Sequence, residues 1–190
     1  MKKIIGIGLI ALAALLVAAV YLKTGSNQLL PNSFKGANVG LQTYFCADFK
    51  PANSNEWKSL GCVHNVLTNA GKDHIKGVLG GAITTNIPIL YLALGNGTAP
   101  TASDTVLNNE ITICGLARQQ GTYYNLGTGW WEVNTTFTYT CTGTLVVNTT
   151  GAFNQATSGT FFAGGTIPTV TFSTNGDQLR LRHNYTVSEV

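Results

Sequence analysis

Charged residues are scarce in this chain of 190 residues. Lysine and arginine together number 11, aspartate and glutamate number 8, and only 10% of the residues are charged. The formal net charge is +3, and it falls to +1 when Lys2 and Lys3 at the N-terminus are set aside. Electrostatic capture of nucleic acid needs clustered lysine and arginine, and the sequence contains no such cluster. We therefore expect no nucleic-acid partner.

Catalytic motifs are also absent. The sequence has no zinc-hydrolase motif, nucleophile elbow, phosphate-binding loop or EF-hand. His74 is expected on a helix surface beside Asp73, and His183 is expected as a core residue on the apolar face of a strand. The sequence therefore predicts a protein that is not an enzyme and has no cofactor and no metal. A secreted hydrolase that uses His74 or His183 is the disfavoured alternative.

One hydrophobic run is long. Residues 4–22 are apolar and follow Met1-Lys2-Lys3. This pattern is typical of a secretory signal peptide, but ~20 apolar residues also suffice to span a bilayer. Two alternatives stay open for residues 1–22: a cleaved signal peptide, or a retained N-terminal membrane or assembly helix. Both predict that the rest of the protein is extracellular or at the cell surface, or on a virion.

The rest of the chain predicts one β-rich domain. Residues 23–40 form a linker or a candidate donor strand, and residues 41–190 form the domain. Apolar side chains fall on one face and polar ones on the other at residues 133–141 and 179–187. We expect further strands at residues 41–49, 58–66, 87–94, 110–124, 143–147 and 169–173. This pattern favours a mainly β fold, an antiparallel β-sandwich or jelly-roll preceded by the apolar N-terminal helix.

A short helix is predicted at residues 70–79. Thr68 or Asn69 can cap its start, and Gly80-Gly81 ends it. Ile75, Val78 and Leu79 are expected to form its apolar stripe. We expect the helix to cover one end of a sheet.

Four cysteines in an exported chain predict disulfides. Cys46 and Cys62 are equidistant from residue 54 in a turn-like run, and the midpoint of Cys114 and Cys141 falls in Gly127-Thr128-Gly129. Each pair would face across a hairpin, where Cα atoms lie ~4.5 to 5.5 Å apart, so we predict Cys46 with Cys62 and Cys114 with Cys141. A four-cysteine metal site is disfavoured because its ligands usually come in close pairs.

The second pairing places Arg118 on an apolar strand face. Two explanations are open: a bulge near Gly121 that rotates the strand, which we favour, or stacking of the guanidinium on an aromatic ring.

Two sets of residues are candidates for surface contacts. The first set consists of Asn-x-Ser/Thr acceptors for N-glycosylation, at Asn96, Asn134, Asn148 and Asn184. The second set is aromatic and lies near the turn of a predicted hairpin, where it could bind a ligand such as a glycan or form an interface; it consists of Tyr123, Tyr124, Trp130 and Trp131.

Several blocks of the sequence resemble a family of β-rich structural proteins associated with phage and prophage tails, and related microbial surface proteins. The blocks are VHNVLTNAGKDHI at 63–75, YLALGNGTAPTASDTVLNNEI at 91–111, TGAFNQATSGTFFAGGTIPTVTFS at 150–173 and GDQLRLRHNYTVS at 176–188. The resemblance implies a β architecture and a structural role, with no active site. The chain departs from this family in its export segment, its four cysteines, and Arg180, Arg182 and His183 in the last strand.

These observations predict a non-enzymatic, exported structural protein. We expect a self-assembling homo-oligomer or polymer, as an extracellular filament, a pilus-like thread or a surface layer. A neighbouring copy could receive a strand from residues 20–40, in which Leu29, Leu30 and Phe34 would fill pockets. The alternative is a virion structural protein or an adhesin that binds surface glycans. A membrane contact is expected through residues 4–22 if they are not cleaved.

Overall fold

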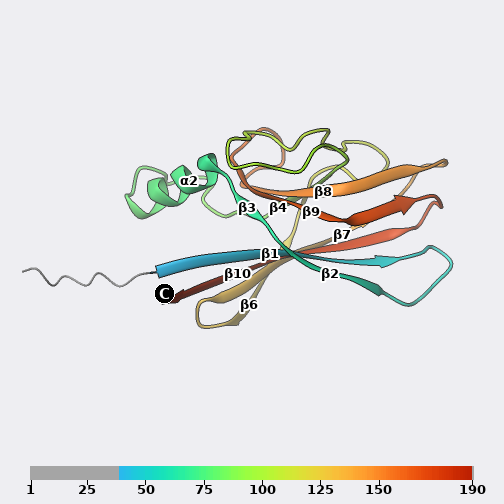
Figure 1. Ribbon diagram of the computed structural model, residues 1–190, viewed down its shortest axis with the longest axis horizontal. Helices are drawn as coiled ribbons and strands as arrows, with labels where there is room; N and C mark the ends of the chain where they lie inside the picture. The colour runs from blue at the N-terminus through green and yellow to red at the C-terminus, as the bar shows by residue number, and fades with distance from the viewer. Residues whose placement is uncertain (1–38, 190) are drawn as a thin grey trace, which may run out of the picture. The chain divides into compact units, whose positions relative to one another are not determined.

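The computed structural model describes residues 39–189 (Figure 1). The predicted N-terminal helix at residues 1–22 and the candidate donor residues Leu29, Leu30 and Phe34 lie outside the described residues, as does Val190. Within residues 39–189, no helix is long and apolar enough to cross a membrane.

Two five-stranded antiparallel sheets form the domain. The first sheet has the order β2 (Lys58–His64), β1 (Val39–Lys50), β10 (Gln178–Glu189), β7 (Trp130–Thr138), β6 (Thr122–Gly127). The second sheet has the order β3 (Val66–Leu67), β9 (Phe161–Phe172), β8 (Leu145–Phe153), β4 (Tyr91–Gly95), β5 (Gln119–Gln120). Figure 1 shows the sheets as two layers. The predicted mainly β, antiparallel fold with one short helix is thus confirmed.

The chain crosses between the sheets on both sides of the domain. On one side β2 leads directly into β3 through Asn65, and on the other side β5 leads into β6 through Gly121. Gly121 N donates a hydrogen bond of 2.7 Å to Leu90 O. A Cβ at Gly121 would lie 2.7 Å from Val133 Cγ1 and 2.8 Å from Asn134 O, so this crossing needs glycine. Both crossings link the edges of the two layers covalently.

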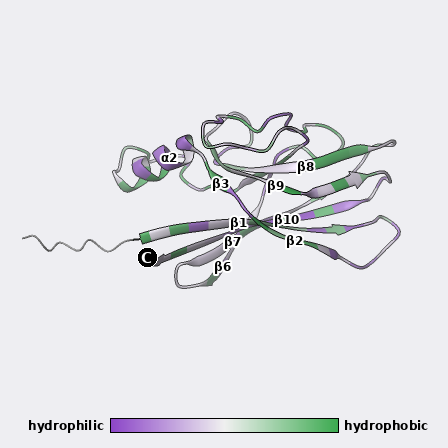
Figure 2. Cartoon of the chain, in the orientation of Figure 1, coloured by the Kyte–Doolittle hydropathy of each residue, from purple (hydrophilic) through white to green (hydrophobic). Residues whose placement is uncertain are grey.

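The main core lies between the two sheets. Leu179, Leu181, His183 and Tyr185 of β10 are buried, and the residues between them are partly exposed, as the alternation predicts. Figure 2 shows hydrophilic and hydrophobic stretches alternating along β1. Large side chains from both sheets fill the core, among them Phe45, Phe137, Leu92 and Phe172.

A second, smaller core covers the opposite face of the second sheet. Phe153, Phe161 and Ala93 of that sheet pack against Leu107, which comes from the long connection after β4. The predicted strand at residues 110–124 is therefore wrong over residues 111–118, where the chain forms a loop against the sheet. The strand predicted at residues 87–94 begins later, at Tyr91.

The helix α2 (Asn69–Leu79) has the predicted caps but a different buried face. The Thr68 side chain accepts a hydrogen bond from Gly71 N, and Gly80 ends the helix. Its buried residues are Gly71, His74 and Gly77, whereas Leu79 is 84% exposed. The predicted apolar stripe is correct for Ile75, which packs against the main core, and wrong for Leu79. Gly71 brings the helix backbone very close to Phe162 O of β9, and Gly77 packs against Ile83. His74, predicted at the surface, is buried, with Nε2 2.8 Å from Ile87 O.

Both predicted disulfides are present. Cys46 and Cys62 are direct partners across β1 and β2, with Cα atoms 4.0 Å apart. Cys114 and Cys141, whose Cα atoms are 5.1 Å apart, join the loop after β4 to the segment after β7. The predicted hairpin setting of this second pair is wrong, because neither cysteine lies in a strand and Cys114 has a φ of 60°. Two disulfides are consistent with an oxidising environment.

A buried carboxylate organises the turn before β10. The oxygens of Asp177 accept hydrogen bonds from the backbone N–H groups of Ser173, Thr174 and Ala52, each 2.9 Å long. Burial alone would raise the pKa of Asp177, but these three donors keep that pKa below its ordinary value of 3.8. The carboxylate thereby ties the turn before β10 to the turn after β1.

Replacing this carboxylate should destabilise the domain. We expect Asp177→Asn to lower the free energy of unfolding by about 2 kcal/mol at pH 7, since charged acceptors are stronger than neutral ones. Because the folded pKa is depressed, the difference from wild type should be fully present above the ordinary pKa of 3.8 and be lost progressively as the pH falls from there through the lower folded pKa. Urea denaturation measures both effects. The control is Asp104→Asn, which removes a charged acceptor from one exposed turn at Thr101 and should lower the free energy of unfolding by less. Equal losses of stability in the two variants would contradict the role of Asp177.

Candidate functional site

The free edge of β6 is the most unusual surface of the domain. Among the described residues, the only partner strand of β6 is β7, so its other edge has no neighbour. All six of its residues are exposed, including Tyr123 at 55%, Tyr124 at 45% and Leu126 at 40%. The strand contains no charged residue and no proline. Such an edge can accept a strand from another chain.

The other sheet edges carry features that discourage pairing. In β2, a bulge opposite Ala47 and Asp48 interrupts the ladder, and Lys58 is exposed. The edge strands β3 and β5 of the second sheet have two residues each. Beyond β3, Pro168 interrupts the outer part of β9. Bulges, lysine, proline and short edge strands all limit edge-to-edge association, and β6 has none of them except a register shift at its last residues.

The structure divides the four predicted aromatic residues between the two faces of the first sheet. Tyr124 lies opposite Glu132 and next to Trp130 on the outer face. Tyr123 lies opposite Val133 on the inner face, together with Trp131. Trp131 is half-buried and stacks on Tyr185 with ring centroids 4.8 Å apart and planes 8° apart. The four residues therefore surround the β6 edge and do not form one flat platform.

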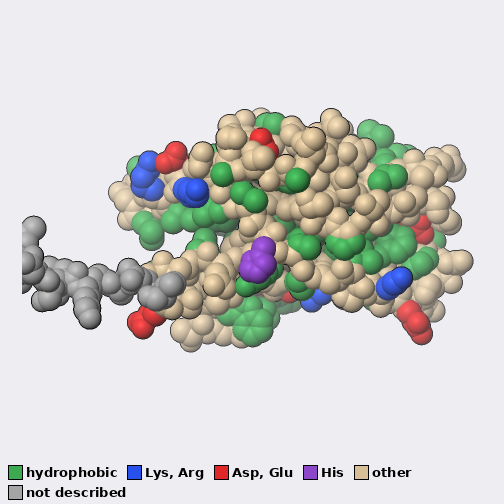
Figure 3. Space-filling model, in the orientation of Figure 1, with side chains coloured by type: hydrophobic (Ala, Val, Ile, Leu, Met, Phe, Trp, Pro, Cys, Tyr) green, Lys and Arg blue, Asp and Glu red, His purple; other side chains and the backbone are tan. Residues whose placement is uncertain are grey.

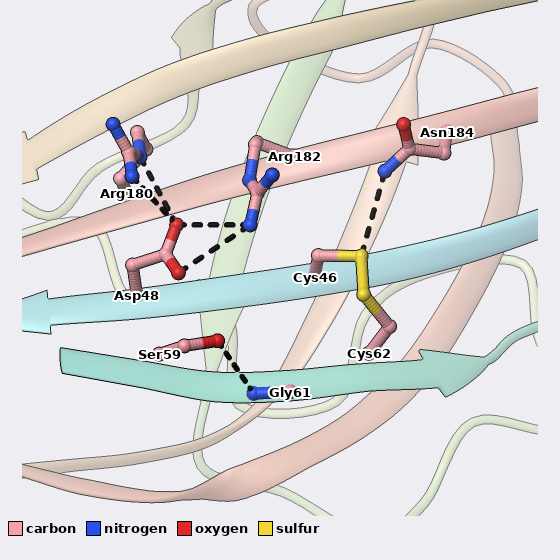
Figure 4. Close-up of a disulfide and its surroundings, with 8 residues drawn as sticks. All are labelled: Cys46, Asp48, Ser59, Gly61, Cys62, Arg180, Arg182 and Asn184. Atoms are coloured by element: carbon pink, nitrogen blue, oxygen red, sulfur yellow. Dashed lines mark hydrogen bonds and ion pairs between the residues drawn. A yellow bond between two sulfur atoms is a disulfide. The ribbon is translucent and has the colours of Figure 1, made fainter.

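Charged residues are few on the rest of the surface, and three of them form a cluster on the first sheet. Figure 3 shows that uncharged polar and hydrophobic atoms make up most of the visible face of the domain. On the outer face of the first sheet, Asp48 is buried between Arg180 and Arg182, at 3.0 and 3.1 Å from their Nη2 atoms. Figure 4 shows this cluster beside the Cys46–Cys62 disulfide. The two arginines that distinguish the last strand thus neutralise a buried carboxylate.

His183 belongs to the core, as the sequence predicts. It is fully buried, stacks on Phe45 with ring centroids 4.2 Å apart, and places Nε2 2.7 Å from Asn65 Nδ2. Asn65 Oδ1 in turn accepts a hydrogen bond from Thr43. Because Asn65 Nδ2 can only donate, Nε2 is the acceptor and the ring is neutral. Burial lowers the pKa of His183 to about 3.

A half-buried ion pair that the sequence did not predict lies on the outer face of the second sheet. Arg118 Nε and Nη2 donate to the two carboxylate oxygens of Glu110, at 2.9 and 2.6 Å. The Arg118 guanidinium lies 3.3 Å from the ring centroid of Phe153, and its Nη1 donates to Gln155 O at 3.1 Å and Ser158 O at 2.7 Å. The disfavoured alternative, aromatic stacking of Arg118, is therefore correct, on a ring of the second sheet.

This ion pair fixes one wall of a cleft. The cleft has a volume of about 410 Å³ and is lined by three separate segments of the chain, at residues 86–91, Gln120 and residues 154–157. Asn154 joins two of them, because its Nδ2 donates to Asn86 O at 3.0 Å. Within residues 39–189, no group of three or more His, Cys, Asp or Glu side chains is placed to hold a metal ion.

The four predicted glycosylation acceptors differ in accessibility. Asn96 is exposed in the loop after β4. Asn134 and Asn184 are half-buried, and their Nδ2 atoms donate to Glu132 Oε1 at 2.8 Å and to Cys46 Sγ at 3.5 Å. Asn148 Oδ1 is buried without a hydrogen-bond partner in the described part of the chain. Asn96 therefore offers the most accessible amide for an attached glycan.

No protein-family model matches the chain, and no curated protein matches it. The resemblance to tail-associated structural proteins stays a prediction.

Acid should weaken the domain through His183. The folded pKa of about 3 lies below the ordinary 6.5, so the unfolded chain binds the proton more readily between these values. Stability should therefore be complete above pH 6.5 and fall progressively as the pH drops towards 3. The His183→Phe variant lacks this titrating group, so its urea midpoint should fall less than that of the wild type between pH 7 and pH 4. The control is the exposed His64→Phe, which should keep the wild-type slope; equal slopes for all three proteins would refute the assignment.

Proposed function

We propose that this protein is a non-enzymatic, exported structural subunit that assembles with copies of itself. The assembly is an extracellular filament, a pilus-like thread or a surface layer. The observation that carries this proposal is the free edge of β6, which is exposed along its whole length and has no charge or proline to block pairing. Two disulfides and a long apolar N-terminal run support export of the chain to an extracellular or cell-surface location.

An added strand would gain two kinds of stabilisation at β6. Its backbone would satisfy the N–H and C=O groups along the free edge, and its side chains would cover Tyr123, Tyr124 and Leu126. The first four strands of the sheet are already held by long ladders, including twelve residue pairs between β1 and β10. The edge is therefore presented by a rigid sheet, which limits the entropy lost on binding.

The donor segment predicted at residues 20–40 overlaps β1 at residues 39–40, so the proposed occupant is the segment at residues 23–38 of a second copy. This segment contains Leu29, Leu30 and Phe34, and its only charged residues are Lys23 and Lys35. It precedes Val39, which lies at the end of the first sheet where β6 also ends. A segment from another copy can pair in the antiparallel sense, which is slightly more stable.

The alternative is a virion structural protein or an adhesin that recognises surface glycans through Tyr123, Tyr124, Trp130 and Trp131. It is less favoured because these residues divide between two faces of the sheet.

A charge placed on the free edge should block assembly. We expect Leu126→Lys to leave the melting temperature within a few degrees of wild type, since Leu126 is already 40% exposed, and to abolish filaments or layers in negative-stain images. The matched control is Val146→Lys, because Val146 is 39% exposed but lies in the interior strand β8. This variant should assemble normally. Normal assembly of Leu126→Lys would refute the role of β6.

The donor segment is tested separately. A chain that lacks residues 23–38 should sediment as a monomer at concentrations where the full chain polymerises. Assembly without these residues would exclude strand donation. A full chain that stays monomeric at all concentrations would exclude exchange between copies.

A further inference from the structure

The cleft behind the Arg118–Glu110 pair has the character of a ligand site. Its volume of about 410 Å³ falls within the ~300–1,000 Å³ typical of small-molecule pockets. It lies at the edge of the second sheet, where β4 and β5 meet the loop after β8. The polar side chains that line it are Asn86, Tyr91, Gln120, Asn154, Gln155 and Thr157.

The chemistry of this lining favours a neutral ligand. None of the lining residues is Asp, Glu, Lys, Arg or His. Each of the four carboxamides offers both a donor and an acceptor, which matches hydroxyl groups that donate and accept. The ring of Tyr91 and the apolar surfaces of Pro88 and Leu90 lie in the same cleft and can cover C–H groups. A pattern of carboxamides beside an aromatic ring is complementary to a carbohydrate.

The walls of the cleft are held before any ligand binds. Arg118 binds the carbonyls of Gln155 and Ser158, and Glu110 neutralises its charge. Asn154 Nδ2 donates to Asn86 O, and Asn154 Oδ1 accepts from Thr160 N at 2.7 Å. Asn86 is held in the left-handed region with a φ of 51°, a conformation that non-glycine residues seldom adopt.

Three of the carboxamides are not used by the fold. Within residues 39–189, the side chains of Asn86, Gln120 and Gln155 form no hydrogen bond with another side chain or with the backbone, whereas that of Asn154 forms two. A ligand could engage these side chains without breaking an existing contact of the fold.

We propose that this cleft binds a neutral oligosaccharide. The site is separate from the β6 edge and does not depend on self-assembly. The sugar can be a free or foreign glycan, or a glycan attached to a second copy, for which Asn96 is the most accessible acceptor.

The test uses the full chain from a host that does not N-glycosylate. Neutral probes are mannotriose, maltotriose and N-acetylchitotriose, and sialyllactose is the charged comparison; binding is followed by ligand-observed NMR and calorimetry. We expect at least one neutral probe to bind more tightly than sialyllactose. Gln120→Ala and Gln155→Ala should each weaken it about threefold to tenfold, the scale of one lost hydrogen bond, with unchanged melting temperatures.

Matched controls separate this site from other surfaces. Gln42→Ala removes an exposed glutamine on β1 and should bind as wild type does. Absence of binding by every neutral probe at 10 mM ligand, roughly the weak limit of such assays, would overturn the proposal. Binding that survives in both cleft variants but is lost in Trp130→Ala would also overturn it.

The two sources of sugar are distinguished with protein from a glycosylating host. If glycans of a second copy occupy the cleft, enzymatic deglycosylation should increase binding of the added neutral probe. If the ligand is free or foreign, deglycosylation should leave that binding unchanged. Either result supports a carbohydrate site, provided that Gln155→Ala weakens binding of the probe in the same experiment.

Discussion

The loop that covers the outer face of the second sheet depends on one half-buried ion pair. Two charges taken out of water are costly, and the pair between Arg118 and Glu110 is compensated by bidentate geometry, by the ring of Phe153 and by two backbone carbonyls. The contacts join the loop after β4, the face of the second sheet and the loop after β8. A long irregular connection can thus cover a sheet face that would otherwise need a helix or a third sheet. The smaller core around Leu107 and the cleft walls both follow from it.

The strands that face the main core could be predicted from the sequence. In β10 and β7 one face is buried and the other is not, so the sequence alternates there with the period of the pleat. The loop at residues 111–118 could not be predicted in this way, because its apolar residues resemble those of a strand while tertiary contacts bury only some of them, such as Ile111 and Leu116. One signal was present: in a chain with only 10% charged residues, Arg118 and Glu110 lie eight positions apart amid apolar neighbours. Their partnership depends on Phe153, which is distant in the sequence.

The candidate sites could likewise be predicted only in part from the sequence. The aromatic residues near the turn between β6 and β7 were found from the sequence, but their separation onto two faces needs the strand register. The cysteine pairs were also correct, but the hairpin argument holds only for Cys46 and Cys62, because Cys114 and Cys141 lie outside strands. The helix caps were predictable from local chemistry, whereas the full buried face was not, since Gly71 and His74 contact Phe162 of β9 and neither belongs to the apolar stripe. The cleft combines three segments whose proximity no local pattern records.

The ladder between β1 and β10 has a mechanical consequence. Its twelve residue pairs join the first strand of the domain to the last, and β2 is fixed to β1 on the other side by a disulfide. Hydrogen bonds between antiparallel strands lie perpendicular to the strands. Because Val39 pairs with Glu189, tension between these two ends would open the ladder one residue pair at a time, whereas tension that leaves at the opposite end of the sheet would load these bonds in shear, so that many would have to break together. The mechanical resistance of the first sheet therefore depends on where a load leaves it.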